Sequence, residues 1–385
     1  MSETPAKDKT AAGVRRRTTD KWRTARWVRR GVQIASFTLF VSLLLAAQQR
    51  VEAFPLANVF FRLDPLASFS TMLAAREWIP NLAPALITVA FALVVGRVWC
   101  GWICPLGTLL GWLRFPPARR LERRLSPRLR SPKYVLLGGI AAMAALGSLT
   151  LLVLDPITLL TRAATTSLLP GLDAAVTALE ETLVDLGTGD TQIAWMEAHL
   201  RGVVLPATQP HFDQALALLL LFLTVVLLNL LADRFWCRYL CPLGALLGLV
   251  AKVQVLRPIA GETCTTCGMC ARSCRMAAIE RVAEDTPAKT ETDAGSGGAA
   301  AAARAYDVGL RVASAECTMC LDCLVACPRH DAMSLGSSLK PGPWAHYDPS
   351  RREFVTAAAL GVGVAAGAGA ALLLGGAAPA VANPR

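Results

Sequence analysis

The sequence predicts a mostly α-helical fold: a polytopic membrane helical bundle with an inserted cysteine-rich domain and a C-terminal membrane span. Of the 385 residues, 54% are hydrophobic and only 17% are charged, whereas roughly a quarter are charged in a typical soluble chain. Several apolar runs are long enough to cross a bilayer, which takes about 20 helical residues. All 12 cysteines lie in short-spaced groups, which is the spacing of metal ligands rather than of scattered disulfides.

The expected spans follow one another in alternating directions. They cover residues 31–48, 82–99, 134–154, 214–235 and 354–377. Lys and Arg gather on the cytoplasmic side of membrane helices, and they are dense in residues 1–30 and 114–133. We therefore expect a multi-pass protein of the bacterial cytoplasmic (inner) membrane, with its N-terminus and residues 236–353 inside and its C-terminus outside. Because the basic residues lie beside apolar runs, nucleic acid is not an expected partner.

An internal repeat organises the first four spans. Residues 97–111 read RVWCGWICPLGTLLG, and residues 234–248 read RFWCRYLCPLGALLG. A weaker repeat, Leu-Asp-Pro, occurs at residues 63–65 and 154–156. Each half is therefore expected to contain a span, a Leu-Asp-Pro loop, a second span and a cysteine element. Two halves of the same orientation predict two parallel-repeat helix pairs, related by an axis along the membrane normal.

Eight cysteines form two runs of identical spacing, Cys-x2-Cys-x2-Cys-x3-Cys. This spacing is typical of bacterial ferredoxins, in which three thiolates of a run bind one 4Fe-4S cluster and the fourth binds the other. One predicted ligand set is Cys264, Cys267, Cys270 and Cys327, and the other is Cys317, Cys320, Cys323 and Cys274. A pair of structural zinc sites is the alternative, although zinc ligands are usually spaced as separated pairs. Arg275 replaces the usual proline after the first run, where it could tune the reduction potential or alter the local turn.

The other four cysteines belong to the repeat as two Cys-x3-Cys-Pro elements: Cys100, Cys104, Cys237 and Cys241. Residues four apart share a helix face, so each pair is expected to project together at the cytoplasmic end of its span. The four thiols could bind a third cluster, bind copper as a soft metal, or cycle between dithiol and disulfide. The alternative is that they are small buried hydrophobic side chains. Their duplication together with Pro105 and Pro242 argues against that.

The pairing of two membrane Cys-x3-Cys-Pro motifs with a 2×4Fe-4S ferredoxin resembles the membrane polyferredoxin family. That family includes the membrane ferredoxin of periplasmic nitrate reductase, the maturation protein of nitrous oxide reductase, and the copper-handling accessory protein of cytochrome oxidase assembly. The resemblance covers roughly residues 30–340. It implies a four-span core with cytoplasmic clusters that moves electrons between a quinone pool or a cytoplasmic donor and a respiratory redox partner.

The resemblance implies an electron-transfer subunit rather than a stand-alone enzyme. Its expected partners are the lipid bilayer, a quinone or quinol, and a membrane-bound or exported redox enzyme. The alternative is a copper-handling, assembly or redox-sensing maturation factor for a respiratory metalloenzyme. Asp64 and Asp155, each followed by proline, could accept protons from a quinol. An Asp-Pro pair is more often a helix N-cap followed by proline at the first helical position.

The remaining segments complete the expected domain order. Residues around 283–304 are rich in Ala, Gly, Thr and Asp, which predicts a solvated loop. Arg351 and Arg352 precede an Ala/Gly-rich run that resembles a twin-arginine export signal, and an anchor, a cleaved segment and a truncated fusion stay open for it. The expected domains are a basic, largely disordered cytoplasmic arm (1–30), a four-span core (31–250), the ferredoxin domain (251–340) and a C-terminal membrane segment (341–385).

Overall fold

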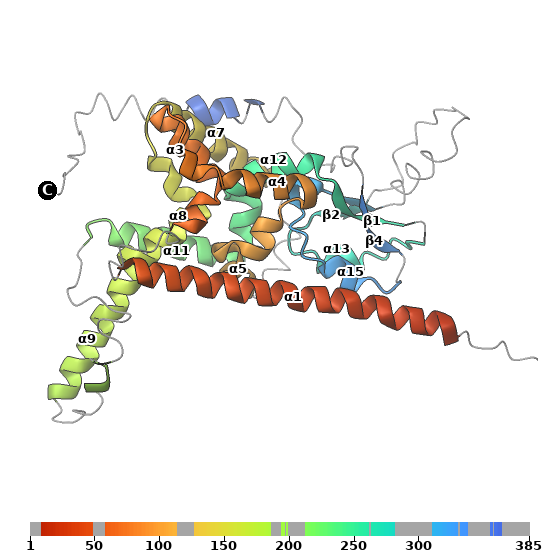
Figure 1. The fold of residues 1–385 in the computed structure, drawn as a ribbon, viewed down its shortest axis with the longest axis horizontal. Coiled ribbons are helices and arrows are strands. Elements are labelled where there is room, and N and C mark those ends of the chain that lie inside the picture. Colours follow the sequence, from red (N-terminus) through yellow and green to blue (C-terminus); the bar gives the residue numbers. More distant parts are fainter. Residues whose placement is uncertain are drawn as a thin grey trace, which may run out of the picture. The chain divides into compact units, whose positions relative to one another are not determined.

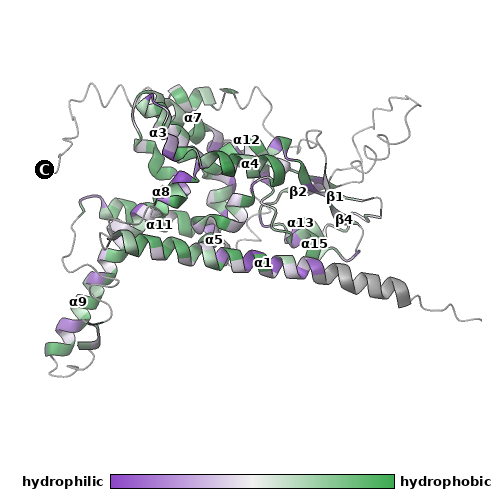
Figure 2. Ribbon diagram, viewed as in Figure 1, coloured by the Kyte–Doolittle hydropathy of each residue, from purple (hydrophilic) through white to green (hydrophobic). Residues whose placement is uncertain are grey.

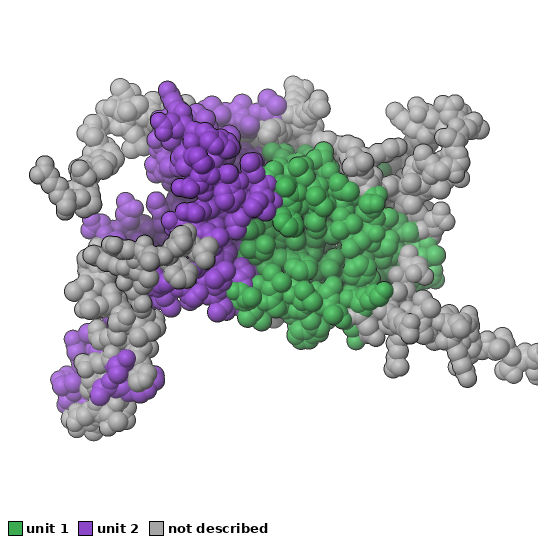
Figure 3. Space-filling view, viewed as in Figure 1, with its two compact units in different colours: residues 1–35, 89–103, 247–348 green, residues 36–88, 104–246, 349–385 purple. Residues whose placement is uncertain are grey.

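The structure is a computed structural model. It describes residues 9–48, 58–113, 127–185, 194–196, 198, 212–261, 263–281, 310–329, 332–337, 355–356 and 358–363. The described residues are mostly helical, as predicted, with two short two-stranded sheets (Figure 1). They divide into two compact units (Figure 3). Unit 1 holds residues 1–35, 89–103 and 247–348, and unit 2 holds residues 36–88, 104–246 and 349–385.

Unit 1 contains two antiparallel strand pairs and two short helices in the region expected to be a ferredoxin domain. The pairs are β1 (Leu256–Ala260) with β4 (Met333–Ser337), and β2 (Ile279–Arg281) with β3 (Leu310–Val312). Helix α13 (Met269–Ser273) follows the second cysteine of the first run, and α15 (Asp322–Ala326) occupies the same place in the second run. Buried side chains from the four strands and α15 form the core: Ala260, Ile279, Leu310, Val312, Leu324 and Met333. The loop predicted at 283–304 lies outside the described residues.

Helix α1 (Lys9–Gln48) contributes residues to both units. The expectation of a largely disordered arm over residues 1–30 is therefore wrong from Lys9 onward. Trp22 and Ala25 pack against the core of unit 1, and Arg29 is buried there. Such tertiary contacts stabilise most protein helices more than intrinsic propensity does, and they are invisible in the local basic composition of this segment.

The other helical elements of unit 1 come from the first repeat, from the start of the ferredoxin region and from the segment just before its second cysteine run. They are most of α4 (Ala85–Val95), the π-helical turn η2 (Trp99–Ile103), and the 3₁₀ turns η8 (Ala251–Val253) and η9 (Ser314–Glu316). Helix α12 (Pro242–Val250) reaches unit 1 at Leu247.

Unit 2 is helical throughout its described part. Its α-helices are α2 (Val59–Arg62), α3 (Pro65–Ala75), α5 (Pro105–Trp112), α7 (Pro132–Ala145), α8 (Pro156–Ala163), α9 (Leu169–Asp185) and α11 (Ala215–Leu227). Its other turns are η1 (Pro80–Leu82), η3 (Pro127–Arg130), η4 (Thr150–Leu154), η5 (Ala164–Leu168), η6 (Leu228–Leu230) and η7 (Trp236–Leu240). The stretch between the predicted spans 134–154 and 214–235 is thus helical from Pro156 to Asp185.

The first predicted span lies within α1, whereas the second, third and fourth apolar runs form α-helices shorter than the predicted spans. Within the described residues, one helix, Lys21–Ala47, is long and apolar enough to cross a membrane. Gly96 and Gly147 interrupt the second and third runs, because each adopts a left-handed backbone with φ of 78° and 84°. Apolar residues nevertheless concentrate along the second half of α1 and along α4 and α11 (Figure 2). Of the fifth predicted span, residues 355–356 and 358–363 are described, and they are helical.

The internal repeat is visible in local structure. Asp64 caps α3 and Asp155 caps α8, in each case with proline as the first helical residue. The more common of the two interpretations of these Asp-Pro pairs, a helix N-cap, is therefore confirmed. In both copies a π-helical turn leads to the second cysteine, and an α-helix beginning with Pro105 or Pro242 follows.

Candidate metal centres

The first predicted cysteine set surrounds one cavity of unit 1. Its walls include Leu310, Pro328 and Met333, together with the four cysteines Cys264, Cys267, Cys270 and Cys327. Cys270 is buried and Cys267 is exposed. Burial raises the pKa of Cys270, and the neighbouring Cys264 and Cys327 raise it further. Burial likewise raises the pKa of Cys327.

The second predicted set surrounds a separate cavity of unit 1, beside Pro258, Met276 and Ile279. Its four thiols are Cys274, Cys317, Cys320 and Cys323. Burial raises the pKa of Cys317 to about 12, with a further contribution from the charge of Cys320. Burial also raises the pKa of Cys323 well above its ordinary value.

These pKa shifts bear on what the cavities can hold. A thiol that is costly to ionise becomes a thiolate when a bound metal supplies the compensating positive charge. Each cavity offers four such sulfurs, and Cys274 and Cys327 are each exchanged to the other run's set. The residues present therefore fit two four-thiolate clusters. No disulfide joins any of the 12 cysteines, all of which are described.

Left-handed backbone positions shape both cysteine loops. Thr266 and Gly268 flank Cys267, the second cysteine of the first run, with φ of 48° and 71°. Met319 and Leu321 flank the second cysteine of the second run, with φ of 48° and 62°. Non-glycine residues in this region are strained and persist where the surrounding structure over-determines them. Left-handed turns also bring successive N–H groups together into concavities that bind anions, iron–sulfur centres among them. Only Gly268 could have signalled this in the sequence.

The two Cys-x3-Cys-Pro elements are π-helical turns rather than α-helical ones. Cys100 and Cys237 lie within the turns, whereas Cys104 and Cys241 end them. In the second copy the N–H of Cys241 donates to the carbonyl of Trp236, five residues earlier, at 2.8 Å. The expectation that each pair shares a face of an α-helix is therefore corrected. A π-turn inside helical structure is rare and frequent at functional sites.

The second cysteine of each element has the same surroundings in both copies. Cys104 Sγ accepts from the N–H of Gly107 at 3.4 Å, and Cys241 Sγ accepts from the N–H of Gly244 at 3.3 Å. All four cysteines of the elements are buried. Among the described residues, no group of three or more His, Cys, Asp or Glu side chains converges on a single metal ion.

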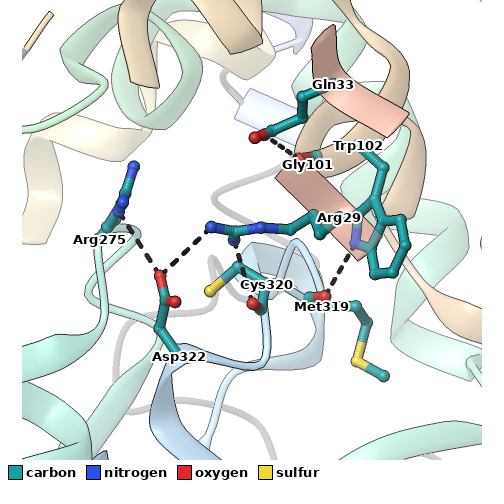
Figure 4. A network of polar contacts seen from close by, with 8 residues as sticks. All are labelled: Arg29, Gln33, Gly101, Trp102, Arg275, Met319, Cys320 and Asp322. Atoms are coloured by element: carbon teal, nitrogen blue, oxygen red, sulfur yellow. Dashed lines mark hydrogen bonds and ion pairs between the residues drawn. The ribbon is translucent and has the colours of Figure 1, made fainter. Parts of the chain in front are cut away.

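The first element contacts the second ferredoxin loop inside unit 1 (Figure 4). Trp102 Nε1 donates to the carbonyl of Met319 at 3.0 Å. A Cβ on Gly101 would clash with the carbonyl oxygen of Thr318, so only glycine fits there without a shift of the backbone. The side chain of Gln33 holds the other side of Gly101 by donating to its carbonyl at 2.8 Å.

Three arginines surround the same loop, and only one of them, Arg275, is distinguished by its place in the cysteine motif. Arg97 is fully buried and pairs with Glu316 at 2.9 Å. Arg29 donates to the carbonyl of Cys320 at 3.0 Å and lies 3.7 Å from the carboxylate of Asp322. Arg275, the departure from the ferredoxin pattern, approaches the same carboxylate at 3.5 Å (Figure 4). Positive charge next to an iron–sulfur centre raises its reduction potential.

Together, the two four-cysteine cavities and the repeated Cys-Pro turns define a ferredoxin-type iron–sulfur protein. The family described as a 4Fe-4S binding domain matches residues 78–124 and 214–260, which are the two repeats with their Cys-x3-Cys-Pro turns. The assignment of 4Fe-4S clusters as the cofactor is thereby confirmed. The two ferredoxin runs lie outside the matched segments.

The chain is similar to several ferredoxin-type proteins. It is 29% identical over 235 residues to the methylamine utilization ferredoxin-type protein MauN of Methylorubrum extorquens, covering 60% of this chain and 63% of that protein. It is 27% identical over 220 residues to the ferredoxin-type protein NapH of Escherichia coli, covering 55% and 59%. It is 30% identical over 196 residues to the regulatory protein NosR of Pseudomonas aeruginosa, covering 50% and 22%. The resemblance to the polyferredoxin family is confirmed, and no solved structure matches the chain.

Proposed function

We propose that this protein is a membrane-bound electron-transfer subunit. It passes electrons between a quinone pool or a cytoplasmic donor and a respiratory redox partner. In this proposal Cys264, Cys267, Cys270 and Cys327 ligate the first 4Fe-4S cluster, and Cys274, Cys317, Cys320 and Cys323 ligate the second. The four cysteines of the Cys-x3-Cys-Pro turns carry a further redox function as ligands of a third cluster or as dithiols.

One observation supports the electron path most directly. The residues between Cys317 and Cys320 touch the residues that follow Cys100, through the Trp102–Met319 hydrogen bond and the close approach of Gly101. A cluster held by this loop is thereby close to the first Cys-x3-Cys-Pro turn. The contact is made by backbone groups on the loop side, so it survives most changes of side chain there.

The charges around the two cysteine sets support an order of the clusters. Arg29, Arg97 and Arg275 surround the loop of the second set, and Arg97 is fully buried. Near the first set, the hydrogen bonds of Arg272 and Arg329 are exposed, so solvent screens their charge. Glu316 and Asp322 offset two of these three positive charges and leave a net positive charge beside the second set. The second cluster is therefore expected to have the higher reduction potential and to hold the electron before it reaches the Cys100 turn.

Exposed apolar side chains support the membrane location. Leu86 and Phe91 on α4, and Leu216 and Leu220 on α11, each expose more than half of their surface. A soluble monomer rarely exposes a large contiguous apolar patch, whereas lipid-facing helices do so as a rule. We propose the multi-pass inner-membrane arrangement expected from the sequence, with the N-terminus and the ferredoxin domain cytoplasmic.

A second candidate is a redox-sensing or copper-handling maturation factor for a respiratory metalloenzyme. The likeness to the regulatory protein NosR favours it, although the chain covers 22% of that protein. In this case the clusters would report a redox state instead of conducting electrons. This candidate would be favoured if the full chain bound copper and if replacing its Cys-x3-Cys-Pro cysteines lowered the amount of copper bound per chain.

The decisive test begins with iron, acid-labile sulfide and EPR of the anaerobically purified protein. About eight irons per chain correspond to two 4Fe-4S clusters, and about twelve to three. The protein with Cys100, Cys104, Cys237 and Cys241 all replaced by serine is then compared with wild type. We expect dithionite to reduce its ferredoxin clusters normally while electron exchange with a quinone analogue is lost. Unchanged exchange would rule out a role for these cysteines in the path.

A narrower variant tests the contact between the turn and the loop. Gly101→Ala places a Cβ against the carbonyl of Thr318, so we expect it to perturb the EPR signal of the second cluster and to slow electron exchange. Gly31→Ala is the matched control, because a Cβ on Gly31 meets no atom within 4 Å. Equal behaviour of the two variants would contradict the proposed path.

A further inference from the structure

The two cysteine runs of unit 1 differ in what covers them. In the second run, other parts of the same unit lie over the loop between the first two cysteines. Trp102 Nε1 donates to the carbonyl of Met319 and Arg29 donates to that of Cys320, both at 3.0 Å (Figure 4). Thr318 and Met319 are each only 3% exposed. This loop therefore already has a partner within the chain, formed by α1 and the first Cys-x3-Cys-Pro turn.

The corresponding loop of the first run is open to solvent. The residues in the places of Thr318, Met319 and Cys320 are all exposed: Thr265, Thr266 and Cys267. Thr265 and Cys267 also line the first cavity, so that cavity reaches the surface at this loop. A cluster ligated by Cys267 has an edge that a second protein can approach. Electron tunnelling falls steeply with distance, so such an edge is where electrons can enter.

Two arginines bind the exposed loop at its two ends. Arg329 Nη1 donates to the carbonyl of Thr263 at 3.3 Å. Arg272 Nη2 donates to the carbonyl of Cys267 at 3.4 Å and to the sulfur of Met269 at 3.2 Å. Both arginines are exposed, and Met269 is 42% exposed. The guanidinium groups therefore lie at the surface on either side of the exposed cysteine.

This surface has a charge that its counterpart lacks. In the second run the places of the two arginines are taken by uncharged residues, Val325 and Met276. We call the exposed surface of the first run the first-loop face: Thr265, Thr266, Cys267, Met269, Arg272 and Arg329. Its side chains carry two positive charges and no negative one.

The character of the first-loop face favours an acidic protein as its occupant. Positive charge around a reactive centre attracts a negatively charged partner and speeds its association. Electron-transfer encounters are weak and bury little surface, so a small face is sufficient. A membrane surface is less suitable, because interfacial binding needs a larger apolar area than Met269 supplies. A second copy is also less suitable, since a twofold contact would place the same positive charges against one another.

We propose, as a deepening of the cytoplasmic-donor arm of the proposed function, that the first-loop face docks an acidic one-electron carrier protein. One electron leaves the reduced carrier, which is thereby oxidised, and reduces the first cluster. No bond forms or breaks, and no proton is transferred. The electron then passes to the second cluster, whose loop contacts the Cys100 turn. The two equivalent loops thus serve opposite ends of one path, with an external partner at the first and an internal one at the second.

The test measures binding first. The full-length, cluster-loaded protein is held in nanodiscs of neutral lipid, and the probe is flavodoxin, an acidic one-electron carrier. Both partners are oxidised, so a change of reduction potential cannot alter the result. We expect the Arg272→Gln, Arg329→Gln double variant to associate about tenfold more slowly at low ionic strength, the lower end of what electrostatic steering supplies. The difference should disappear at high ionic strength, because salt screens exposed charges.

Two further variants make the result specific. Arg311→Gln is the matched control, because it removes one positive charge from β3 of the same unit. Leu310 and Val312 on either side of it are buried toward the two cavities, and successive side chains of a strand point to opposite faces. Met269→Glu keeps both arginines and adds a negative charge beside Arg272, so it should also slow association. Iron content and the EPR signal after dithionite reduction should be unchanged in every variant.

Electron delivery is measured next, by mixing reduced flavodoxin with the protein anaerobically and following oxidation of its flavin. We expect the rates to follow the association rates. Equal association of the double variant and Arg311→Gln would overturn the docking site. So would an effect that appears only in nanodiscs of anionic lipid, which indicates a membrane contact, or a change of oligomeric state, which indicates a second copy.

The outcomes also separate the docking site from the proposed function. Clusters that a quinol analogue reduces and flavodoxin does not would overturn the docking site and leave the electron-transfer function standing. Clusters that dithionite reduces and that exchange electrons with neither flavodoxin nor a quinone analogue would overturn both. Slower association and slower flavin oxidation in the double variant, with Arg311→Gln like wild type, is the expected result.

Discussion

The two units bury charge in opposite ways. In unit 1 the acids beside the second cysteine set face arginines, as in the Arg97–Glu316 pair and in Asp322 between Arg29 and Arg275. In unit 2 the buried Asp64 and Asp155 each cap a helix, with no cation bound to either carboxylate among the described residues, and burial together with the charge of Asp155 raises the pKa of Asp64. The surroundings in unit 1 suit a resident anion such as a thiolate-bound cluster. Those in unit 2 suit a site whose charge changes by gain and loss of a proton.

Removing a shared ligand should have the largest effect on unit 1. Cys327 comes from the second run but belongs to the first cavity. We expect Cys327→Ser to lose the first cluster and to destabilise the second, because the ligand sets interlock. The measurement is iron content and EPR of the reduced protein. Unaltered EPR signals from both clusters in Cys327→Ser would refute the interlocked ligand sets. Cys267→Ser is the comparison variant, because it removes an exposed ligand of the same cavity that comes from the first run itself.

Breaking the buried ion pair should be the next largest change. Arg97→Gln removes the cation beside Glu316 while both positions stay buried. Loss of one partner of a buried pair typically costs about 3–5 kcal/mol. We expect a clear fall in the midpoint of thermal unfolding of the cluster-loaded protein. Arg272→Gln, at an exposed arginine, is the control. If the two variants lowered the midpoint of thermal unfolding equally, the Arg97–Glu316 pair would contribute little to stability.

The buried Asp155 of unit 2 predicts that the free energy of unfolding depends on pH. The pKa of Asp155 is raised from 3.8 to about 6 in the folded protein. A raised pKa means that the folded state binds the proton more tightly than the unfolded state does. The resulting stabilisation is complete below the ordinary pKa and is lost as the pH rises through about 6. Thermal unfolding followed from pH 4 to 8 should show this loss in wild type and not in the Asp64→Asn, Asp155→Asn double variant.

The smallest effect is expected at Arg275. Its contact with Asp322 is long, at 3.5 Å, and Asp322 also lies 3.7 Å from Arg29, so the carboxylate keeps a cationic partner when Arg275 is removed. Arg275→Gln should therefore leave stability almost unchanged and lower the reduction potential of the second cluster, with the first unaffected. A redox titration followed by EPR checks both. Equal shifts of the two clusters would mean that the arginine acts on unit 1 as a whole.

The local part of the sites could be predicted from the sequence. Cysteine spacing predicted the two four-thiol sets, and the Asp-Pro pairs predicted the caps of α3 and α8. The cysteine sets and the caps depend on residues that are close together in the chain. Cys274 and Cys327 are the exception, and the ferredoxin spacing rule assigns each of them to the set of the other run. The mostly helical fold followed from apolar runs in the same way.

The surroundings of the sites could not be predicted. Arg97 and Arg29 reach the second cysteine loop across 218 and 291 residues of chain, and nothing local distinguishes them from other basic residues. The π-turns at the two cysteine elements were read as α-helices, because both forms have the same composition. The lengths of the apolar helices were overestimated where Gly96 and Gly147 turn the backbone, since an isolated glycine does not by itself end an apolar run.

The exchange of Cys274 and Cys327 between the two runs sets an order for the maturation of the protein. During synthesis the first run leaves the ribosome before the second run does. Its cavity lacks the fourth thiol until Cys327, the last cysteine in the sequence, has also been synthesised. The second cavity needs Cys274 and is otherwise supplied by its own run. Neither cluster could therefore be completed on a nascent chain that ends before the second run. A truncated polypeptide would carry unfilled thiols exposed to oxidation, and iron delivery is coupled to completion of the whole domain.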